Sequence, residues 1–322
     1  MSKDQLIDSL GRIDGEIIQK VEKERTRAKP KRVFRRWLAM SACFAMILSI
    51  ALTAEAASGS VSNLLAPLFG GAQTEIVDQI GVPVGASVSV NGYTLTADAI
   101  IGDRYTCAVV YTLSRDDGLP VPDNVIFLEW HPYINRGGSG GGSLSAGIRD
   151  EKNPNVVHFI ESWRRQAPLI GRISTSTFST LAIHNKDGED TVLSEGTWGI
   201  TYTLRYLDSS EEIPVRDLYV TDKGGNDYQV KKLLLSPVGI HLDLILYDPV
   251  FAAPKLTDFE VSLLLTDGTQ VPMRNGGGGG SMREGDKSVK LSYSAMFDTP
   301  IHRENIAKIL ICGTVLEMND FD

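Results

Sequence analysis

The chain is poor in cysteine, with three in 322 residues. Cys43 lies in an apolar run, whereas Cys107 and Cys312 lie far apart in segments of strand-like composition. So few cysteines exclude a small secreted module that is held together by disulfides. A bridge between Cys107 and Cys312 and a pair of unbridged core cysteines both remain open, and the frequent burial of free thiols favours the second.

Patterns that carry enzyme chemistry are also missing. The histidines form no H-x-H or H-E-x-x-H pattern and no cluster with cysteine, so the sequence predicts no metal site. No ordered set of Ser, His and Asp, no pair of catalytic carboxylates and no phosphate-binding loop is readable. We therefore predict a protein that is not an enzyme, without catalytic residues and without a cofactor.

One histidine has an acidic neighbour at strand spacing. His241 and Asp243 fall on the same face of a predicted strand, where they could act as two metal ligands. Alternation with Leu242, Leu244 and Leu246 instead favours an exposed polar stripe opposite a buried apolar one.

Long apolar runs are scarce as well, because only Leu38–Ala54 is long enough to span a bilayer. A membrane-spanning helix takes roughly 17 to 25 apolar residues, so we predict one over residues 37–57. The basic residues that precede it fix its orientation by the positive-inside rule, with the N-terminus in the cytoplasm and the C-terminal part outside the cell. These membrane-orienting residues are Lys31, Arg32, Arg35 and Arg36.

A cleaved signal peptide is the alternative interpretation of this run. Ala54-Glu55-Ala56 has the small-x-small form that a signal peptidase recognises. The region before the run is 36 residues long, much longer than the basic start of a signal peptide, and this favours a retained anchor.

The charge is divided unevenly along the chain. Residues 1–36 carry 11 basic and 6 acidic side chains, and the remaining residues carry 21 basic and 34 acidic ones. A basic tail suits the anionic inner face of a membrane, and the acidic remainder lacks the clustered Lys and Arg that bind phosphates. The large C-terminal part is therefore not expected to bind nucleic acid.

Residues 1–36 are expected to form a cytoplasmic amphipathic helix followed by the basic patch. An isolated helix of about 20 residues is marginal in water, so its apolar stripe needs a surface to cover it. That surface is either the lipid bilayer or a cytoplasmic protein, and the acidic character of the first half of the helix favours a protein. The partner-binding residues are Leu6, Leu10, Ile13, Ile17 and Val21.

The hydrophobic period changes from that of helices to that of strands near Ala86. Residues 58–85 are expected to form a stalk of short helical pieces, broken at Pro67 and at Gly70-Gly71. Asn91-Gly92, flanked by alternating residues, predicts a hairpin. The predicted strands indicate two antiparallel β-sandwich domains of immunoglobulin-like type, 86–208 and 209–322. These strands are 104–113, 124–130, 156–163, 177–184, 197–207, 213–220, 228–235, 239–247, 258–265, 287–294 and 306–316.

Two glycine-rich runs interrupt this pattern, at residues 137–143 and 276–280. Such runs contribute nothing to a core and behave as flexible tethers. Because each lies between predicted strands, we expect two mobile hairpin tips.

The arrangement resembles a group of bacterial membrane proteins. The tail Leu6–Ile18, ahead of the basic patch and single span, resembles single-pass proteins of Gram-positive, Clostridia-type bacteria. Ile80–Gly85, Asn91–Thr96 and Ala99–Asp103 resemble an exported domain of unknown function that occurs among regulators of the anti-sigma-factor type. Leu235–Ile240 is similar to the immunoglobulin-like domain that follows it. The tail lacks the zinc-binding H-x-x-x-C-x-x-C pattern of well-defined anti-sigma factors.

Two functions are compatible with these features. The first is a single-pass signalling or regulatory protein, in which an exported β-sandwich sensor with an unknown extracellular ligand is coupled to the tail helix. The resemblance implies a sigma factor as the cytoplasmic partner of that helix. The second is a cell-surface binding or structural module, whose tail serves only for anchoring and orientation.

Overall fold

The computed structural model describes residues 60–71, 74–136, 140–150, 152–247, 256–271, 273–280 and 287–318. All of them belong to one compact unit, Thr53–Asp322, which is built mainly of antiparallel strands. The predicted tail helix and the predicted span lie outside the described residues. Among the described helices, none is long and apolar enough to cross a membrane.

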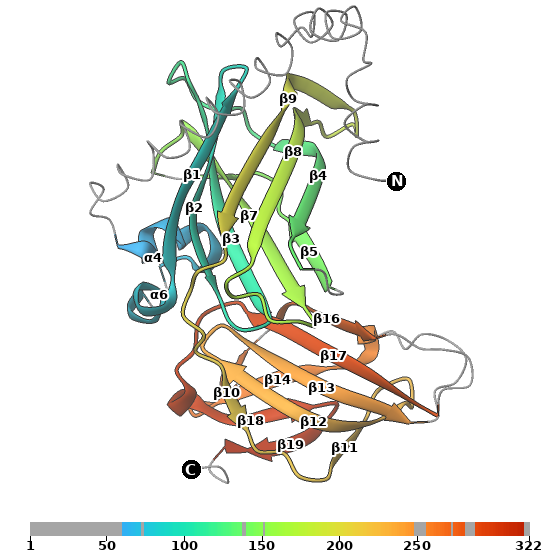
Figure 1. The fold of residues 1–322 in the computed structure, drawn as a ribbon. Helices are drawn as coiled ribbons and strands as arrows, with labels where there is room; N and C mark the ends of the chain where they lie inside the picture. The colour runs from blue at the N-terminus through green and yellow to red at the C-terminus, as the bar shows by residue number, and fades with distance from the viewer. Residues whose placement is uncertain are drawn as a thin grey trace, which may run out of the picture. The chain divides into compact units, whose positions relative to one another are not determined.

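The expected stalk is packed onto a sheet rather than standing apart from it. Its helices, α4 (Val61–Leu64), α5 (Ala66–Phe69) and α6 (Thr74–Ile80), break near the predicted positions and lie against sheet A (Figure 1). Their apolar residues form a buried cluster with side chains of four strands and of one turn, because each helix is too short to be stable alone. From the helices this cluster contains Leu65, Leu68, Phe69, Ile76, Val77 and Ile80.

Sheet A begins with the predicted hairpin. Asn91 and Gly92 both have positive φ, 47° and 83°, and they join β1 to β2 in the type of turn that matches strand twist. The strand order is β1-β2-β3-β7-β5, and β6 also pairs with β7. The strands are β1 (Val82–Val90), β2 (Tyr93–Gly102), β3 (Thr106–Arg115), β5 (Gly140–Leu144), β6 (Ile148–Arg149) and β7 (Val156–Arg165).

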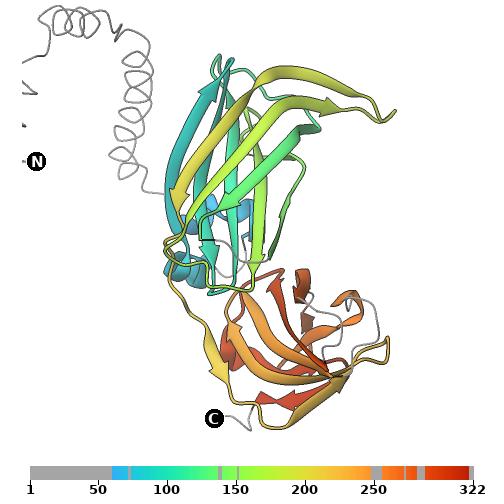
Figure 2. The same cartoon turned by 45° about the vertical axis from the view of Figure 1, so that its right-hand side comes forward.

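Sheet B lies across a shared core from sheet A, as the turned view shows (Figure 2). Its order is β4-β8-β9, with bounds Val125–Ile134, Ile173–His184 and Asp190–Thr203. Inward-facing residues of both sheets form one buried cluster that includes Tyr111, Phe178 and Trp198. The alternation of apolar residues predicted from the sequence therefore supplies this core.

Sheets C and D enclose a second core. Sheet C has the order β10-β12-β13-β17-β16 with β11 on β12, and sheet D the order β15-β14-β18-β19. Sheet C contains β10 (Glu211–Ile213), β11 (Leu218–Thr221), β12 (Asp227–Ser236), β13 (Gly239–Tyr247), β16 (Met273–Gly280) and β17 (Ser288–Phe297). Sheet D contains β14 (Val261–Leu265), β15 (Gln270–Val271), β18 (Ile306–Ile311) and β19 (Thr314–Glu317).

Two of the predicted strands are each divided in the structure. The segment 213–220 starts at the last residue of one strand, β10, and continues into a second strand, β11. The segment 306–316 is a hairpin, because Cys312 and Gly313 adopt φ of 49° and 84° between β18 and β19. Cysteine is not a turn former, so its apolar character concealed the turn in the sequence.

The expectation that both glycine-rich runs are hairpin tips is wrong. Gly140–Gly142 belong to β5 at one edge of sheet A, and Gly276–Gly280 belong to β16 at one edge of sheet C. Each run pairs with a regular neighbour, β7 or β17, whose fixed backbone provides hydrogen-bonding partners for the glycine residues.

The two described cysteines are free thiols. Cys107 is fully buried in the core between sheets A and B, whereas Cys312 packs against the core between sheets C and D. Cys107 and Cys312 are therefore not joined by a disulfide, which is the alternative that the sequence favoured.

Truncation of Leu65 to Ala tests the packing of the helices. Leu65 is fully buried, while its neighbour Leu64 is 36% exposed. Leu65→Ala is expected to lower the free energy of unfolding by about 2–5 kcal/mol, as for other buried leucines. Leu64→Ala is the matched control, and thermal unfolding of the full chain in mild detergent is the measurement. Equal effects of the two substitutions would mean that the helices do not belong to the core.

Candidate functional site

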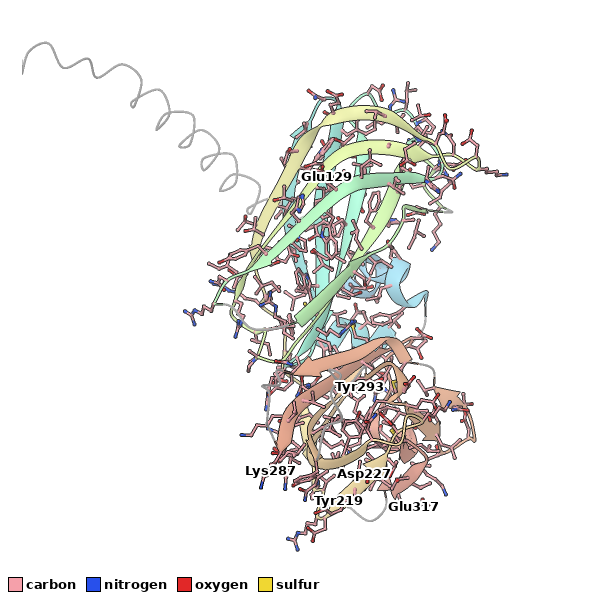
Figure 3. All side chains as sticks on the ribbon, turned by 90° about the vertical axis from the view of Figure 1, so that its right-hand side faces the viewer. Glu129, Tyr219, Asp227, Lys287, Tyr293 and Glu317 are labelled. Atoms are coloured by element: carbon pink, nitrogen blue, oxygen red, sulfur yellow. The ribbon has the colours of Figure 1, made fainter. Side chains whose placement is uncertain are left out.

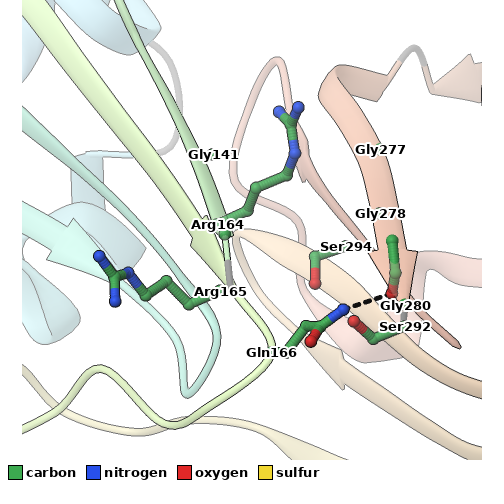
Figure 4. A pocket seen from close by; sticks show the side chains of 11 residues that line it. Gly141, Arg164, Arg165, Gln166, Gly277, Gly278, Gly280, Ser292 and Ser294 are labelled. Carbon is green, nitrogen blue, oxygen red and sulfur yellow. Dashed lines mark hydrogen bonds between the residues drawn. The ribbon is translucent and has the colours of Figure 1, made fainter. Parts of the chain in front are cut away.

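The two glycine-rich edge strands, β5 and β16, approach each other. β5 is hydrogen-bonded to β7, and β16 is hydrogen-bonded to β17. Residues of β5 and β16 come close together, yet within the described chain no ladder of backbone hydrogen bonds joins the two strands. Figure 4 shows this region, in which the side chain of Arg164 extends between Gly141 and Gly277.

Arg164, near the end of β7, lies beside glycines of both strands. A Cβ atom on Gly141 would lie 3.4 Å from Nη2 of Arg164, and one on Gly277 would lie 3.2 Å from the same atom. The second distance is tight, so a side chain at Gly277 would move the tip of Arg164 by a few tenths of an ångström. Glycine at both positions therefore leaves room for a guanidinium group between the edges of two sheets.

A cavity of about 230 Å³ opens at this place. Its lining combines backbone groups of glycine with side chains of arginine, glutamine and serine, and it includes no Asp, Glu, His, Cys or Tyr. Such a lining can hold a ligand by hydrogen bonds, but it offers no ordinary general base. The lining residues are Gly140, Gly141, Arg164, Arg165, Gln166, Gly277, Gly278, Gly279, Gly280, Ser292 and Ser294.

Two arginine charges act on titratable groups beside the cavity. Burial lowers the pKa of Arg165, and the nearby charge of Arg172 lowers it further. Burial raises the pKa of Tyr293 to about 12, and the charge of Arg164 opposes this increase. Tyr293 is on β17, among the strands of sheet C (Figure 3). Burial is thus the larger influence on both groups, and the arginine charges add a smaller one.

Gln166 connects the end of β7 to β16. Its side-chain amide Nε2 donates a hydrogen bond to the carbonyl oxygen of Gly279, drawn as a dashed line in Figure 4. A carbonyl group of β16 thus accepts a hydrogen bond from outside sheet C, on the side that lines the cavity.

Sheet A also meets sheet C through a buried carboxylate. Asp103, in the β2–β3 turn, is 3% exposed. It accepts hydrogen bonds from the backbone N–H groups of Tyr105 at 2.9 Å and Thr106 at 2.7 Å, and from the hydroxyl of Ser236 at 2.9 Å. The buried carboxylate has the partners that its burial requires, and one of them comes from β12.

His241 continues this contact towards the cavity. Its ring stacks on that of Tyr105, with centroids 3.7 Å apart and planes at 11°. Its Nδ1 lies 2.8 Å from Oγ of Ser294, which lines the cavity, and its Nε2 lies 3.1 Å from Oδ1 of Asp243. The hydrogen bond with His241 lowers the pKa of Asp243. A chain of direct contacts therefore runs from the cavity to the β2–β3 turn.

The prediction of an exposed polar stripe at His241 is wrong. His241 is 2% exposed because Tyr105, which follows the distant strand β2, covers it. Strand alternation indicates which residues share a face, but it does not reveal what packs on that face. Among the described residues no group of three His, Cys, Asp or Glu side chains could hold a metal ion.

A row of polar side chains crosses the face of sheet A that also packs against the helices. The hydroxyl of Thr112 donates to Asp98, Nδ1 of His158 lies 3.0 Å from the same hydroxyl, and Nε2 of His158 lies 3.1 Å from Asp150. Asp98 enters this row because it is the extra residue of a bulge in β2. Burial raises its pKa to about 6, although the Thr112 hydrogen bond and the charge of His158 act in the opposite direction.

A fully buried glutamate lies in the core between sheets A and B. Glu161 accepts hydrogen bonds from Tyr111, from Ser176 at 2.7 Å and from the indole of Trp130 at 3.2 Å. Burial raises the pKa of Glu161, against the effect of these donors. The residues that surround it are large aromatic side chains of a packed core, so we assign Glu161 a structural role.

The sequence prediction found little of this site. The predicted partner-binding residues, Leu6, Leu10, Ile13, Ile17 and Val21, and the membrane-orienting residues lie outside the described chain. The two glycine-rich runs were the available signal, but nothing in their composition showed that they meet. Arg164 and Gln166 carry no motif and become visible only in three dimensions.

Comparisons with known proteins assign the chain to no family. No protein-family model matches it, and no curated protein matches it. Among solved structures, the crystal structure of the conserved domain protein from Bacillus anthracis is similar, with 19% sequence identity and a TM-score of 0.49. The match covers 72% of this chain and 76% of that chain.

Two neighbouring glycines of β16 give a matched test of its geometry. A Cβ on Gly278 would collide with the carbonyl oxygen of Ser292 and lie 2.8 Å from Leu256, whereas a Cβ on Gly279 meets nothing within 4 Å. Gly278→Ala is expected to lower the free energy of unfolding by about 1–3 kcal/mol through overpacking. Gly279→Ala should leave it nearly unchanged in the same thermal unfolding experiment. Similar results for both variants would contradict the pairing of β16 with β17.

The pKa of Asp98 gives a pH-dependent prediction. A carboxyl group whose pKa rises on folding, here from 3.8 to about 6, contributes stability below pH 3.8 that is lost as the pH rises through 6. Asp98→Asn should therefore become more stable relative to the unmodified chain as the pH rises through this range, by up to about 3 kcal/mol at pH 7. Urea unfolding at several pH values measures the difference. Asp117→Asn, at an exposed carboxyl whose pKa Arg115 lowers, should show no such gain.

Proposed function

We propose that the protein is a single-pass membrane regulator whose exported β part binds a ligand and whose cytoplasmic tail binds a protein. In this proposal residues 37–57 are the membrane span, and the two pairs of sheets are two immunoglobulin-like sandwiches. The observation that carries it is the polar cavity between β5 and β16, where the edges of sheets A and C meet.

The lining of the cavity supports binding over catalysis. Arginine, glutamine, serine and glycine backbone groups offer many hydrogen-bond donors, which suit recognition of a polar ligand. The lining includes no Asp, Glu, His, Cys or Tyr, the side chains that commonly transfer protons near neutral pH. We therefore assign the cavity to recognition.

The position of the cavity supports a role in signalling. Ser294 lines the cavity and contacts His241, which stacks on Tyr105 of the β2–β3 turn. A ligand that binds with different affinity to two arrangements of this junction would shift the balance between them. In our proposal this shift passes through the helices on sheet A to the membrane span.

The tail would be the output of this signal. Its apolar stripe, Leu6, Leu10, Ile13, Ile17 and Val21, would fill a groove of a cytoplasmic partner in the helix-in-groove manner. The resemblance of the chain to anti-sigma-factor-type regulators makes a sigma factor the proposed partner. A surface-binding module, the alternative, would use the same cavity without any effect of the tail on gene expression.

Charge reversal in the tail separates these functions. Leu10→Asp/Ile13→Asp, made in the full chain in its own cell, should release the partner and change a defined set of transcripts by roughly fivefold or more. Gln5→Asp/Ser9→Asp adds the same charge to the polar face and is the matched control. Transcript profiles that are the same for both variants and for the unmodified chain would support the surface module and refute the regulator.

A further inference from the structure

We propose that a row of four side chains on sheet A is a proton-operated latch. The row is complete when it holds one shared proton, and it opens at His158 when that proton leaves. Its members are Asp98, Thr112, His158 and Asp150. This inference goes beyond the proposed function and does not depend on it, because it involves neither the cavity nor the tail.

Four elements bring the row together. Thr112 of β3 and His158 of β7 are directly paired residues, and the bulge in β2 places Asp98 next to Thr112. Asp150 directly follows β6, which also pairs with β7. The side chain of His158 is 13% exposed and that of Asp150 is 29% exposed. The row is therefore largely shielded from water, so an incomplete hydrogen bond within it is costly.

The row lies beside the helices. Val110 on β3 and Ile160 on β7 are each two residues from the row on the same face of sheet A, and both belong to the buried cluster under the helices. A change at His158 therefore takes place next to the side chains that hold the helices on the sheet.

Asp150 is held as a carboxylate. Its Oδ1 accepts hydrogen bonds from the backbone N–H groups of Lys152 at 2.7 Å and Asn153 at 3.1 Å, while its Oδ2 faces Nε2 of His158. Burial acts to raise the pKa of Asp150, but these donors and His158 together lower it below its usual value. An ionised carboxylate can only accept, so Nε2 of His158 carries a proton.

The other two contacts need one proton more than an ionised Asp98 and a neutral His158 supply. Thr112 has a single hydroxyl proton, yet its oxygen contacts both Asp98 and Nδ1 of His158. If Asp98 is ionised, the hydroxyl donates to it, and Nδ1 must be protonated as well. If His158 is neutral, the hydroxyl donates to Nδ1, and the carboxyl of Asp98 must be protonated. In both arrangements the complete row holds one extra proton, which passes between Asp98 and His158 through the hydroxyl of Thr112.

Loss of that proton leaves one contact without a hydrogen. Asp98 keeps its bond, because Thr112 is the hydrogen-bond donor that the structure gives to this largely buried carboxylate. His158 therefore loses its contact with either Thr112 or Asp150. Burial raises the pKa of Asp98 to about 6, although Thr112 and His158 oppose this rise. The latch is thus closed below about pH 6 and opens as the pH rises above it.

The charge that acts on Asp98 is that of His158. β1 carries no titratable side chain, and Glu161 of β7 lies in the core on the other face of sheet A. The remaining charged groups on the surrounding elements are bound elsewhere or exposed. Arg149 binds Asp123, Arg115 binds Asp117, Asp78 binds Ser62, and Glu75 and Lys152 are exposed.

The test follows the ring nitrogens of His158 by NMR between about pH 5 and 8. It uses the full chain, labelled with nitrogen-15 histidine and held in detergent micelles, and His158→Gln identifies the signals by their absence. The nitrogen shifts distinguish a charged ring from each neutral tautomer, and the unmodified chain should show a step near pH 6. The signals of the buried His241 report that each variant is folded. A ring of His158 that shows no step in this range would refute the latch.

Asp98→Asn should lock the latch. The amide N–H of asparagine donates to Thr112 as a protonated Asp98 does, but it does not titrate. The step of His158 should therefore disappear, and the ring should stay neutral with its proton on Nε2. Asp190→Asn makes the same change beside His184, an exposed pair 2.8 Å apart, and should leave the step of His158 as it is. A step that persists in Asp98→Asn would overturn the proposal.

Thr112→Val separates a shared proton from a plain effect of charge. This variant removes the hydroxyl but keeps both Asp98 and His158, so it breaks the path between them. In the double variant Thr112→Val/Asp98→Asn the step should return, because His158 then titrates by itself. Thr112→Ser keeps the hydroxyl and should behave as the unmodified chain does. If the step is still missing from the double variant, charge alone acts on His158 and the proton is not shared.

Discussion

The candidate site depends on the approach of two glycine-rich edge strands, β5 and β16, to one arginine. Arg164 extends between β5 and β16, next to Gly141 and Gly277. A Cβ at Gly277 would shift the guanidinium group by a few tenths of an ångström. The same lack of side chains leaves the space that forms the cavity, so the glycine runs explain the arrangement of the edges and the opening between them.

Buried polar groups make the junction specific. Asp103 is held by three donors that come from both sides of the junction, and His241 is enclosed between Tyr105, Ser294 and Asp243. Removal of one partner would leave a buried polar group unsatisfied, which costs more than the loss of an apolar contact. Such groups favour one discrete arrangement of the junction over a continuum of similar ones, and a switch between discrete arrangements is what a ligand sensor requires.

The sequence predicted local structure better than it predicted contacts. The Asn91-Gly92 hairpin and the strand 239–247 follow from turn chemistry and alternation, which are local properties. The burial of His241 and the packing of the helices depend on segments far away in the chain. The glycine runs were wrongly predicted as hairpin tips for the same reason. They form strands because neighbouring strands pair with them, and this pairing is not visible in their own composition.

The candidate site could not be predicted from the sequence for a more specific reason. Its lining residues come from four separate strands, and Arg164 and Gln166 carry no motif by which they could be recognised. The sequence did indicate that the glycine runs are unusual and that enzyme motifs are missing. Only the three-dimensional arrangement brings both runs to one cavity.

The most direct measurement is the regulatory output of a chain with a filled cavity. Gly279→Leu, which adds a side chain at the lining of the cavity where a Cβ meets nothing within 4 Å, is expressed as the full chain in its own cell. It is compared with Gly199→Leu, the same change at an equally open position on β9, by the transcripts that depend on the tail. If the state of the cavity controls partner binding by the tail, these transcripts stay at one level in all growth conditions in Gly279→Leu. In Gly199→Leu they respond as they do with the unmodified chain. An unchanged response in Gly279→Leu would contradict the link between cavity and tail.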